Sequence, residues 1–358
     1  MTEATPHIMG LDPDRLLRAN GWNLDGLSLL TLFTASGCNL KCPYCFTGGW
    51  AKTDTNLKNT DYFALLEQSK VLGASAVWWV GQGEPFLVPF WRDLIIASEK
   101  QNLWIGIFTN GTRLDDNAAQ FVLEHDVSLY MKVNSFDPEI QGRLIGHDGQ
   151  EFLETILPRI EWFVSKGMAT KHRLAVESVI TKLNYDEIPT LFRWCRDRKI
   201  IPFIEMMEHA CDGAKELDVS PEKHIKLFRE LQRIDREEYG YVWDIVPPWA
   251  AYRCRNIYLG LAVDAWGNVT PCSGMRYRLG NIKDKSLKQI WESKEARQFR
   301  NPARHEPQPW DGKSLGRYGC KSHAYHITGD PFAIDPRCAW FNSCCKEEAM
   351  AVTEKAEQ

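Results

Sequence analysis

Three cysteines near the start of the chain, Cys38, Cys42 and Cys45, have the residue type and spacing that suit a metal cluster. Three thiolates in a C-x3-C-x2-C arrangement can hold one side of a [4Fe–4S] cube, which leaves the fourth iron open to a small molecule. A structural zinc site would need a fourth ligand, and the loop offers no further His or Cys. The spacing therefore predicts an iron–sulfur cluster with one open iron.

The loop that carries these cysteines reads Gly37-Cys38-Asn39-Leu40-Lys41-Cys42-Pro43-Tyr44-Cys45-Phe46. It resembles the signature of the radical S-adenosylmethionine (SAM) superfamily, which has this spacing and an aromatic residue before the last cysteine. The resemblance implies that the open iron binds SAM and that an electron from the cluster cleaves SAM into methionine and a 5′-deoxyadenosyl radical. It further implies cofactor contacts from Tyr44 and Phe46, and a flavodoxin- or ferredoxin-type reductant.

A second motif, Gly81-Gln82-Gly83-Glu84-Pro85, follows an apolar run. Glycines let the backbone approach a ligand closely, and a carboxylate can pair with an ammonium group. The motif resembles the family's GGEP sequence with Gln82 inserted between the glycines. The resemblance implies that Gly83 and Glu84 hold the amino group of SAM, whereas the segment taken alone could be a simple turn.

Further cofactor candidates lie at the ends of other predicted strands. Asn110 lies in Thr109-Asn110-Gly111-Thr112, which resembles the family's TNG turn, although Asn-Gly also suits an ordinary turn. Ser135 matches the serine of the family's S-x-D segment, and Arg143 matches an arginine that binds the SAM carboxylate. Ser178 lies where adenine and ribose contacts are usual in the family. Ser135 and Arg143 could instead be polar surface residues at the start of a helix.

The catalytic residues cannot be assigned from the sequence, and three weak candidates stand near the sixth predicted strand. Glu205, Glu208 and His209 could bind a polar substrate or move a proton at a barrel mouth. Each could also be part of a solvated strand end.

A second set of cysteines fills the last third of the chain. Cys254 and Cys272 flank a predicted β-hairpin that turns at Trp266-Gly267-Asn268 and brings the two thiols together. This stretch resembles the SPASM and twitch extensions of radical SAM enzymes, which hold auxiliary clusters. The resemblance implies one auxiliary [4Fe–4S] cluster with these two ligands, although a zinc site is an alternative. Two further ligands are expected among Cys320, Cys338, Cys344 and Cys345.

Six short apolar runs alternate with helical patterns and would position these motifs. We expect strands at Leu29–Phe33, Ala76–Val80, Leu103–Phe108, Ser128–Val133, Leu174–Ile180 and Lys199–Met206. Strands that are each linked by a helix pair in parallel through right-handed crossovers. The fold class is therefore α/β, a partial (β/α)6 TIM-like barrel, with a smaller Cys-rich α+β domain at the C-terminus. Chemistry in such barrels gathers at the carboxyl ends of the strands.

The expected domain boundaries follow from these patterns. We expect a lead-in at 1–28, the radical SAM core at 29–211, a helical connector at 212–248 and the auxiliary-cluster domain at 249–358.

Composition supports a folded protein that works away from membranes and nucleic acid. The 358 residues are 44% hydrophobic and 25% charged, and the net charge of −4 favours neither nucleic acid nor an anionic membrane as a partner. The chain shows neither a signal peptide nor an apolar stretch of membrane-spanning length. We expect a cytoplasmic protein, in which eleven cysteines indicate metal or redox chemistry rather than disulfides.

Two enzyme functions and one non-catalytic function fit these motifs. The favoured substrate is a small polar metabolite, of the sugar, aminocyclitol or nucleoside type, which undergoes dehydrogenation, epimerisation or elimination. The auxiliary cluster would then accept an electron or ligate the substrate. The alternative is a ribosomal peptide that receives a crosslink or an oxidised residue. Family members of that kind frequently have an N-terminal recognition domain, whereas only 28 residues precede the first strand here. A plain iron–sulfur electron carrier is the third possibility, but it would not need Gly83-Glu84.

Overall fold

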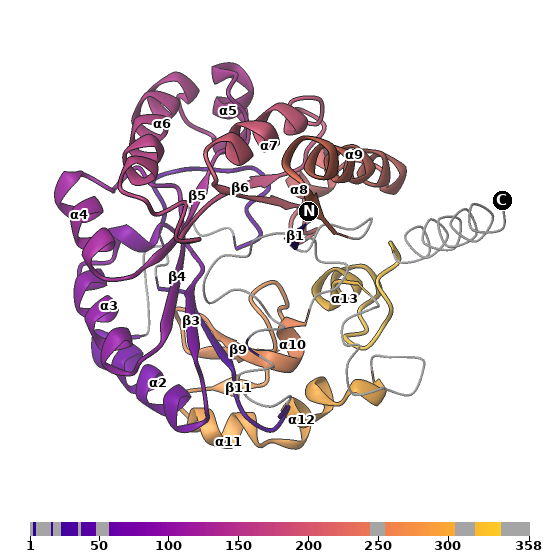
Figure 1. Cartoon of the computed structure of the whole chain (residues 1–358). Helices are drawn as coiled ribbons and strands as arrows, with labels where there is room; N and C mark the ends of the chain where they lie inside the picture. The colour runs from indigo at the N-terminus through magenta and orange to yellow at the C-terminus, as the bar shows by residue number, and fades with distance from the viewer. Residues whose placement is uncertain are drawn as a thin grey trace.

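The computed structural model describes residues 3–4, 16, 23–34, 37–47, 57–243, 255–304 and 319–337. Most of these residues are organised around one sheet with the strand order β11-β10-β9-β2-β3-β4-β5-β6-β7. Its two edge strands, β11 and β7, do not pair with each other, so the barrel is open (Figure 1).

Six parallel strands form the barrel half of the sheet. They are β2 (Leu29–Leu32), β3 (Ala76–Trp79), β4 (Trp104–Thr109), β5 (Ser128–Lys132), β6 (Leu174–Val179) and β7 (Ile201–Glu205). Each pairs in parallel with the next along the chain. The predicted α/β partial barrel is therefore confirmed.

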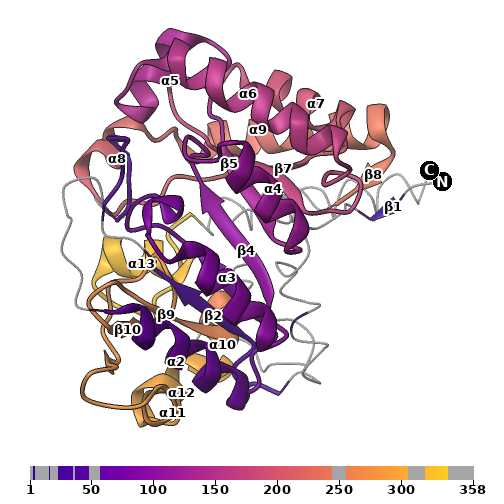
Figure 2. The same cartoon turned by 90° about the vertical axis from the view of Figure 1, so that its left-hand side faces the viewer.

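Helices connect the strands and cover their outer face, as Figures 1 and 2 show. The connecting helices are α2 (Asn59–Val71), α3 (Trp91–Lys100), α4 (Asp116–Glu124), α5 (Pro138–Ile145), α6 (Gly149–Ser165) and α7 (Ile188–Asp197). Local sequence fixes several helix starts, because Asp115, Asp137 and Asp148 each accept hydrogen bonds from the first-turn amides. Cys195 of α7 is fully buried in the core beneath these helices.

Two helices follow the last barrel strand. They are α8 (Asp212–Leu217) and α9 (Pro221–Ile234), which continues into one π-helical stretch at Asp235–Tyr239. The two-residue strand β8 (Tyr241–Val242) then pairs with β1 (Glu3–Ala4) in a separate small sheet.

The C-terminal extension adds three strands to the barrel sheet. These are β9 (Gly260–Val263), β10 (Asn268–Thr270) and β11 (Gly280–Asn281). The hairpin predicted at residues 266–268 joins β9 to β10, and β9 pairs in parallel with β2. A Cβ on Gly260 would lie 2.3 Å from the Leu29 carbonyl oxygen, so the close approach of the two strands requires glycine there. Barrel and extension thus share one continuous sheet.

The remaining helices of the extension are short. They are α10 (Asn256–Leu259), α11 (Leu287–Trp291), α12 (Lys294–Arg300) and α13 (Lys321–Thr328), with 3-10 turns at Pro302–Arg304 and, in the barrel, at Pro85–Leu87. None of the described helices is long and apolar enough to cross a lipid bilayer.

Candidate active site

The cysteine loop begins just after β2, at the carboxyl edge of the barrel. Cys38, Cys42 and Cys45 are half-buried there. Within the loop, the Leu40 amide donates to the Cys38 Sγ at 3.4 Å and the Cys45 amide donates to the Cys42 carbonyl at 3.1 Å. The loop is fastened to the barrel by the Lys41 amide, which donates to the Ile145 carbonyl at 2.8 Å. The three predicted ligands are therefore held together on one short, anchored turn.

The electrostatics of the three thiols fit a metal–thiolate cluster. Burial raises the pKa of Cys42 to about 12, and it also raises the pKa of Cys38. Cys45 lies close enough to raise both values further by repulsion between thiolates. Three thiolates gathered this way need a positive charge such as iron to be stable.

The Gly81–Pro85 motif packs directly against the start of the cysteine loop. The Glu84 amide donates to the Gly37 carbonyl at 2.9 Å. Gly83 has φ +155°, and a Cβ at this position would lie 1.8 Å from the Gly37 carbonyl oxygen. No side chain fits between the two segments, so the glycine is required by this contact. The motif thereby fixes the height of the cysteine loop above the barrel.

Glu84 joins this motif to the Asn110 turn. Its side chain is 1% exposed, and its carboxylate accepts from the Thr109 hydroxyl at 2.6 Å and the Asn110 amide at 2.8 Å. A third hydrogen bond comes from the Phe86 amide at 3.1 Å. Burial raises the pKa of this carboxyl to about 7. Glu84 thus holds two predicted motifs together, and its contact with the amino group of SAM stays a prediction.

Asn110 and Phe46 also lie beside the cysteine loop. The Asn110 side-chain amide donates to the Asn39 Oδ1 at 3.0 Å and points at the Cys38 Sγ from 3.8 Å. The Phe46 carbonyl accepts from the Arg276 guanidinium of the extension at 3.1 Å. These contacts place both residues next to the proposed cluster.

Tyr44 rests on a buried amide that sequence reasoning missed. Its hydroxyl oxygen accepts from the Asn134 side chain at 2.7 Å, and Asn134 in turn accepts from the Val179 amide at 3.0 Å. Asn184 donates to the carbonyls of Asn134 and Val179 at 2.8 and 3.0 Å. Two buried asparagines therefore connect β5 and β6 beneath the cysteine loop. The available signal was an asparagine directly after a predicted strand.

The remaining cofactor candidates differ in burial and in their hydrogen-bond partners. The Ser135 hydroxyl donates to the Glu187 carboxylate, and the Ser178 hydroxyl donates to the Val133 carbonyl. Both serines are fully buried, whereas Arg143 is exposed on α5. The serines are thus occupied by protein partners in this structure. Their roles and that of Arg143 toward SAM stay predictions.

The three catalytic candidates separate into two places. Glu205 ends β7 and faces the barrel interior, where it lies beside Glu177 and Lys132. Glu208 instead accepts from Cys320 at 3.5 Å and from Ser322 at 3.2 Å, both at the start of α13.

His209 lies with Glu208 on the side of the extension. Its Nε2 is 2.6 Å from the Asp218 carboxylate, and its ring contacts the His323 ring at 4.8 Å between centroids. Of the three candidates, Glu205 is therefore the one that faces the barrel interior.

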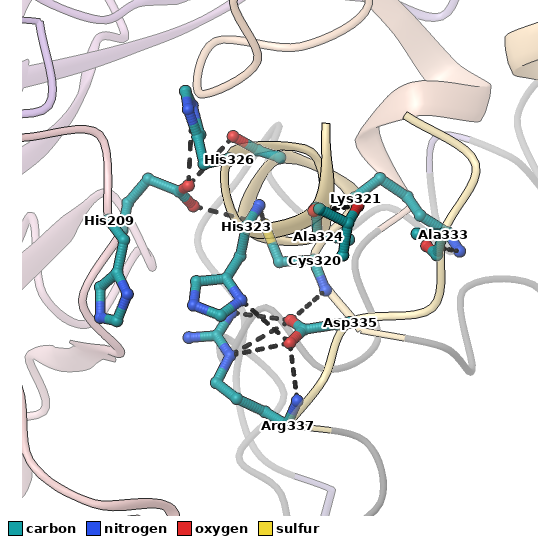
Figure 3. A network of polar contacts seen from close by, with 12 residues as sticks. His209, Cys320, Lys321, His323, Ala324, His326, Ala333, Asp335 and Arg337 are labelled. Atoms are coloured by element: carbon teal, nitrogen blue, oxygen red, sulfur yellow. Dashed lines mark hydrogen bonds and ion pairs between the residues drawn. The ribbon is translucent and has the colours of Figure 1, made fainter. Parts of the chain in front are cut away.

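A charged network holds the described part of the C-terminal cysteine site. Asp335 accepts from the Cys320 amide at 3.0 Å, from His323 at 3.0 Å and from the Arg337 guanidinium at 2.8 Å (Figure 3). Arg337 also donates to the Met207 carbonyl at 3.4 Å. The network attaches α13 to the segment after β7.

Two of the predicted auxiliary ligands come from neighbouring segments. The residues after Cys272 pack on α13, because a Cβ on Gly274 would lie 2.8 Å from the Ser322 hydroxyl. Cys320 is the N-cap of the same helix. Cys254, Cys338, Cys344 and Cys345 lie outside the described residues, so the ligand set stays a prediction.

Comparison with known proteins identifies two domains. Residues 32–195 match the family described as the radical SAM superfamily, and residues 254–311 match the SPASM family, an iron–sulfur cluster-binding domain. Together the two domains imply a SAM-binding [4Fe–4S] cluster, SAM itself and auxiliary iron–sulfur chemistry.

Curated relatives align with most of the chain. The tungsten-containing aldehyde ferredoxin oxidoreductase cofactor-modifying protein of Pyrococcus furiosus is 24% identical over 303 residues, which is 76% of this chain and 83% of that protein. The sporulation killing factor maturation protein SkfB of Bacillus subtilis is 23% identical, over 73% of this chain and 63% of its own length. The PqqA peptide cyclase of Xanthomonas axonopodis pv. citri is 22% identical, over 84% of each chain.

Among solved structures, Streptococcus suis SuiB bound to the precursor peptide SuiA superposes with a TM-score of 0.68. The two proteins are 18% identical, and the match covers 90% of this chain and 78% of SuiB. The likeness supports the fold.

These relatives contradict the predicted small polar metabolite as substrate and partner. One relative is named a peptide cyclase and another a maturation protein of a killing factor. The prediction depended on the 28 residues before the first strand. The length of that segment indicates whether an accessory domain could fit there. It gives no information about which substrate the barrel interior can bind.

Proposed function

We propose that this chain, which belongs to the radical SAM superfamily and carries a SPASM extension, is an enzyme that modifies a peptide. The observation that carries the proposal is the alignment of a peptide cyclase with 84% of the chain. The aligned length includes both barrel and extension, so the similarity extends beyond the SAM-binding motifs that all members of the superfamily share.

The cofactor-binding residues are part of the same proposal. Cys38, Cys42 and Cys45 hold the SAM-binding cluster, and Cys272 and Cys320 contribute to the auxiliary one. The bound cluster and SAM supply a 5′-deoxyadenosyl radical that removes hydrogen from an unactivated C–H bond. Gly83 and Glu84 set the position of the cysteine loop above the barrel, through the Gly37 contact described above. The barrel walls then align the reacting bond and exclude water.

We also propose that the reaction is a net oxidation, in which the peptide gains a crosslink or an oxidised side chain. The extension supports this proposal, because it forms one sheet with the barrel and adds a second redox centre to the enzyme. The product would be lighter than the substrate peptide by two hydrogen atoms.

The test is an anaerobic reaction with SAM, a reductant and short peptides encoded beside the gene. We expect 5′-deoxyadenosine to form together with a peptide that has lost two hydrogens, both measured by mass spectrometry. The Cys38/Cys42/Cys45→Ala triple variant should form neither product. Formation of 5′-deoxyadenosine with a sugar or nucleoside, and with none of the peptides, would overturn the proposal.

A further inference from the structure

The interior face of the barrel carries side chains that the cofactor motifs do not use. Strand residues alternate between two faces, and the helices bury one of them. The partly exposed strand residues Phe108, Lys132, Glu177, Phe203 and Glu205 all belong to the other face. Neighbouring strands place them side by side, with Lys132 paired in register with Glu177 and Glu177 with Phe203. These five side chains are therefore within reach of solvent on the interior face.

Two carboxyl groups on this face share one lysine. The Lys132 Nζ lies 2.7 Å from a Glu177 carboxylate oxygen, and their side chains are 17% and 12% exposed. Glu205 shares a hydrogen bond with Glu177, so two carboxyl groups lie beside one lysine. Burial and the nearby Glu177 carboxylate raise the pKa of Glu205 well above its ordinary value. A bound cation beside Glu205 would replace this shared proton and let both carboxyl groups ionise.

Tyr130 provides a second and independent sign of a ligand. Its side chain is fully buried on the same face, and its hydroxyl has no hydrogen-bond partner among the described residues. Burial raises the pKa of the Tyr130 hydroxyl well above its ordinary value, and the nearby Glu177 and Glu205 raise it further. Buried hydroxyls are nearly always hydrogen-bonded, so an unpaired one beside two partly exposed carboxyl groups calls for a bound partner.

Aromatic rings form the wall around this hydroxyl. Tyr130 stacks on Phe108 with 4.1 Å between ring centroids and meets Phe203 edge-on at 5.2 Å. These residues form a small cluster separate from the main core beneath the helices. An aliphatic stem that ends in a positive charge suits such surroundings, because rings contact the stem and attract the cation.

We propose that Tyr130, Lys132, Glu177 and Glu205, here called the interior subsite, bind the cationic side chain of a lysine or arginine in the substrate peptide. The ammonium or guanidinium group takes the place of the proton that Glu205 shares with Glu177, and donates to the Glu205 carboxylate and to the Tyr130 oxygen. An acidic side chain would meet two carboxylates, and an apolar one would leave the Tyr130 hydroxyl unpaired. This inference rests on the proposed peptide substrate and adds the side chain that the barrel selects.

The experiment uses fluorescent Gly/Ser pentapeptides that differ only in their central residue. Fluorescence anisotropy measures how tightly each peptide binds the anaerobically reconstituted holoenzyme. The central residue is lysine, arginine, norleucine, glutamine or glutamate. We expect the lysine and arginine peptides to bind about tenfold more tightly than the norleucine peptide, because one charge-assisted hydrogen bond contributes about that much affinity. The glutamate peptide should bind most weakly.

Two variants and one control make the result specific. Glu205→Gln keeps the shape of the side chain and should reduce the preference for lysine over norleucine to about onefold. Tyr130→Phe removes a hydroxyl that has no partner, so it should leave the melting temperature unchanged or higher while it weakens lysine-peptide binding. Glu154→Gln, at an exposed carboxylate on α6, should leave every affinity unchanged.

Equal binding of the lysine and norleucine peptides by the wild type would overturn the interior subsite. An unchanged preference in Glu205→Gln would do the same. If Glu205→Gln does not fold, the Tyr130→Phe variant decides in the same way. Each of these failures leaves peptide modification standing, because that function is judged by the SAM-dependent mass change of the peptide.

Discussion

The two cysteine regions are held in place by different kinds of contact. The Cys38–Cys45 loop is fixed by backbone hydrogen bonds, in which the Glu84 amide meets the Gly37 carbonyl and the Lys41 amide meets the Ile145 carbonyl. The start of α13, at Cys320, is fixed by a charged side-chain network around Asp335. Where two backbone segments touch at a glycine, any larger side chain would clash. A side-chain network depends instead on the charge of its members, so the two regions should respond to different mutations.

The largest effect should come from Gly83→Ala. A methyl group 1.8 Å from the Gly37 carbonyl oxygen must displace the cysteine loop. We expect a loss of about 3 kcal/mol or more in the free energy of unfolding and loss of the iron of the SAM cluster. Iron content after anaerobic reconstitution and thermal unfolding measure the two effects.

The matched control for that variant is Gly329→Ala. Gly329 also has a positive φ, +76°, but nothing lies within 4 Å of its added Cβ. Backbone strain alone should therefore reproduce only a small part of the effect. If both variants lose the same amount of iron, the contact with Gly37 does not hold the loop.

The next effect should come from Asp335→Asn in the other region. The change leaves the buried Arg337 guanidinium without its counter-charge, which costs about 3 kcal/mol when one partner of a buried pair is removed. We expect α13 to loosen, with loss of auxiliary-cluster iron while the SAM cluster is kept. Electron paramagnetic resonance of the reduced protein distinguishes the two clusters. Asp330→Asn, an exposed neighbour, is the control, and retention of all iron in Asp335→Asn would contradict this assignment.

Low pH should destabilise the region around α13 and its charged network before the cysteine loop. Burial lowers the pKa of His224, whose neighbours include Asp218, Arg337 and His209, to about 4. The unfolded chain therefore takes up this proton near pH 6.5 and the folded chain does not, so stability falls as the pH drops from about 6.5 toward 4. We expect a loss of about 2 kcal/mol at pH 5 from this histidine. Urea unfolding from pH 7 to 5 gives the free energy of unfolding of wild type and His224→Phe. This free energy should depend less on pH in the variant, and an equal pH dependence in the two proteins would contradict the role of His224.

The smallest effect should come from Gln82→Ala. The Gln82 side chain, the insertion in the glycine motif, accepts from the Ala265 amide of the β9–β10 turn at 3.0 Å. Loss of this one hydrogen bond should cost about 1 kcal/mol and leave both clusters bound. Thermal unfolding and iron analysis check it. A loss of SAM-cluster iron comparable to that of Gly83→Ala would mean that the motif depends on the extension for its position.

Sequence alone predicted the barrel strands closely, because each is a local apolar run. The expected strands at 29–33 and 76–80 are found at Leu29–Leu32 and Ala76–Trp79. Local sequence gave no hint that β9 would pair with β2, because a contact between distant strands leaves no periodic signal in either of them. The expected fold was therefore a barrel beside an extension, whereas the two share one sheet.

The same reason explains which parts of the site were missed. The Gly83-Glu84 motif is contiguous in the chain and could be found by its spacing. Lys132 and Glu177 become a pair only because β5 and β6 lie in register, and each looks like an ordinary polar residue in its own strand. Asn134 donates to the Tyr44 hydroxyl although the two residues are ninety positions apart in the sequence. Contacts between strands must therefore be known before such residues can be assigned.

The pairing of β9 with β2 has a consequence for how the protein is made. During synthesis β2 emerges early and can pair with β3, but its other edge must wait for residues 260–263. An uncovered strand of this kind, LLTL in sequence, is a template for pairing with other chains. A barrel cut off before the extension would keep that edge exposed permanently. The extension therefore also covers an edge that could otherwise pair with other chains, so we expect the barrel to need the extension to remain unaggregated.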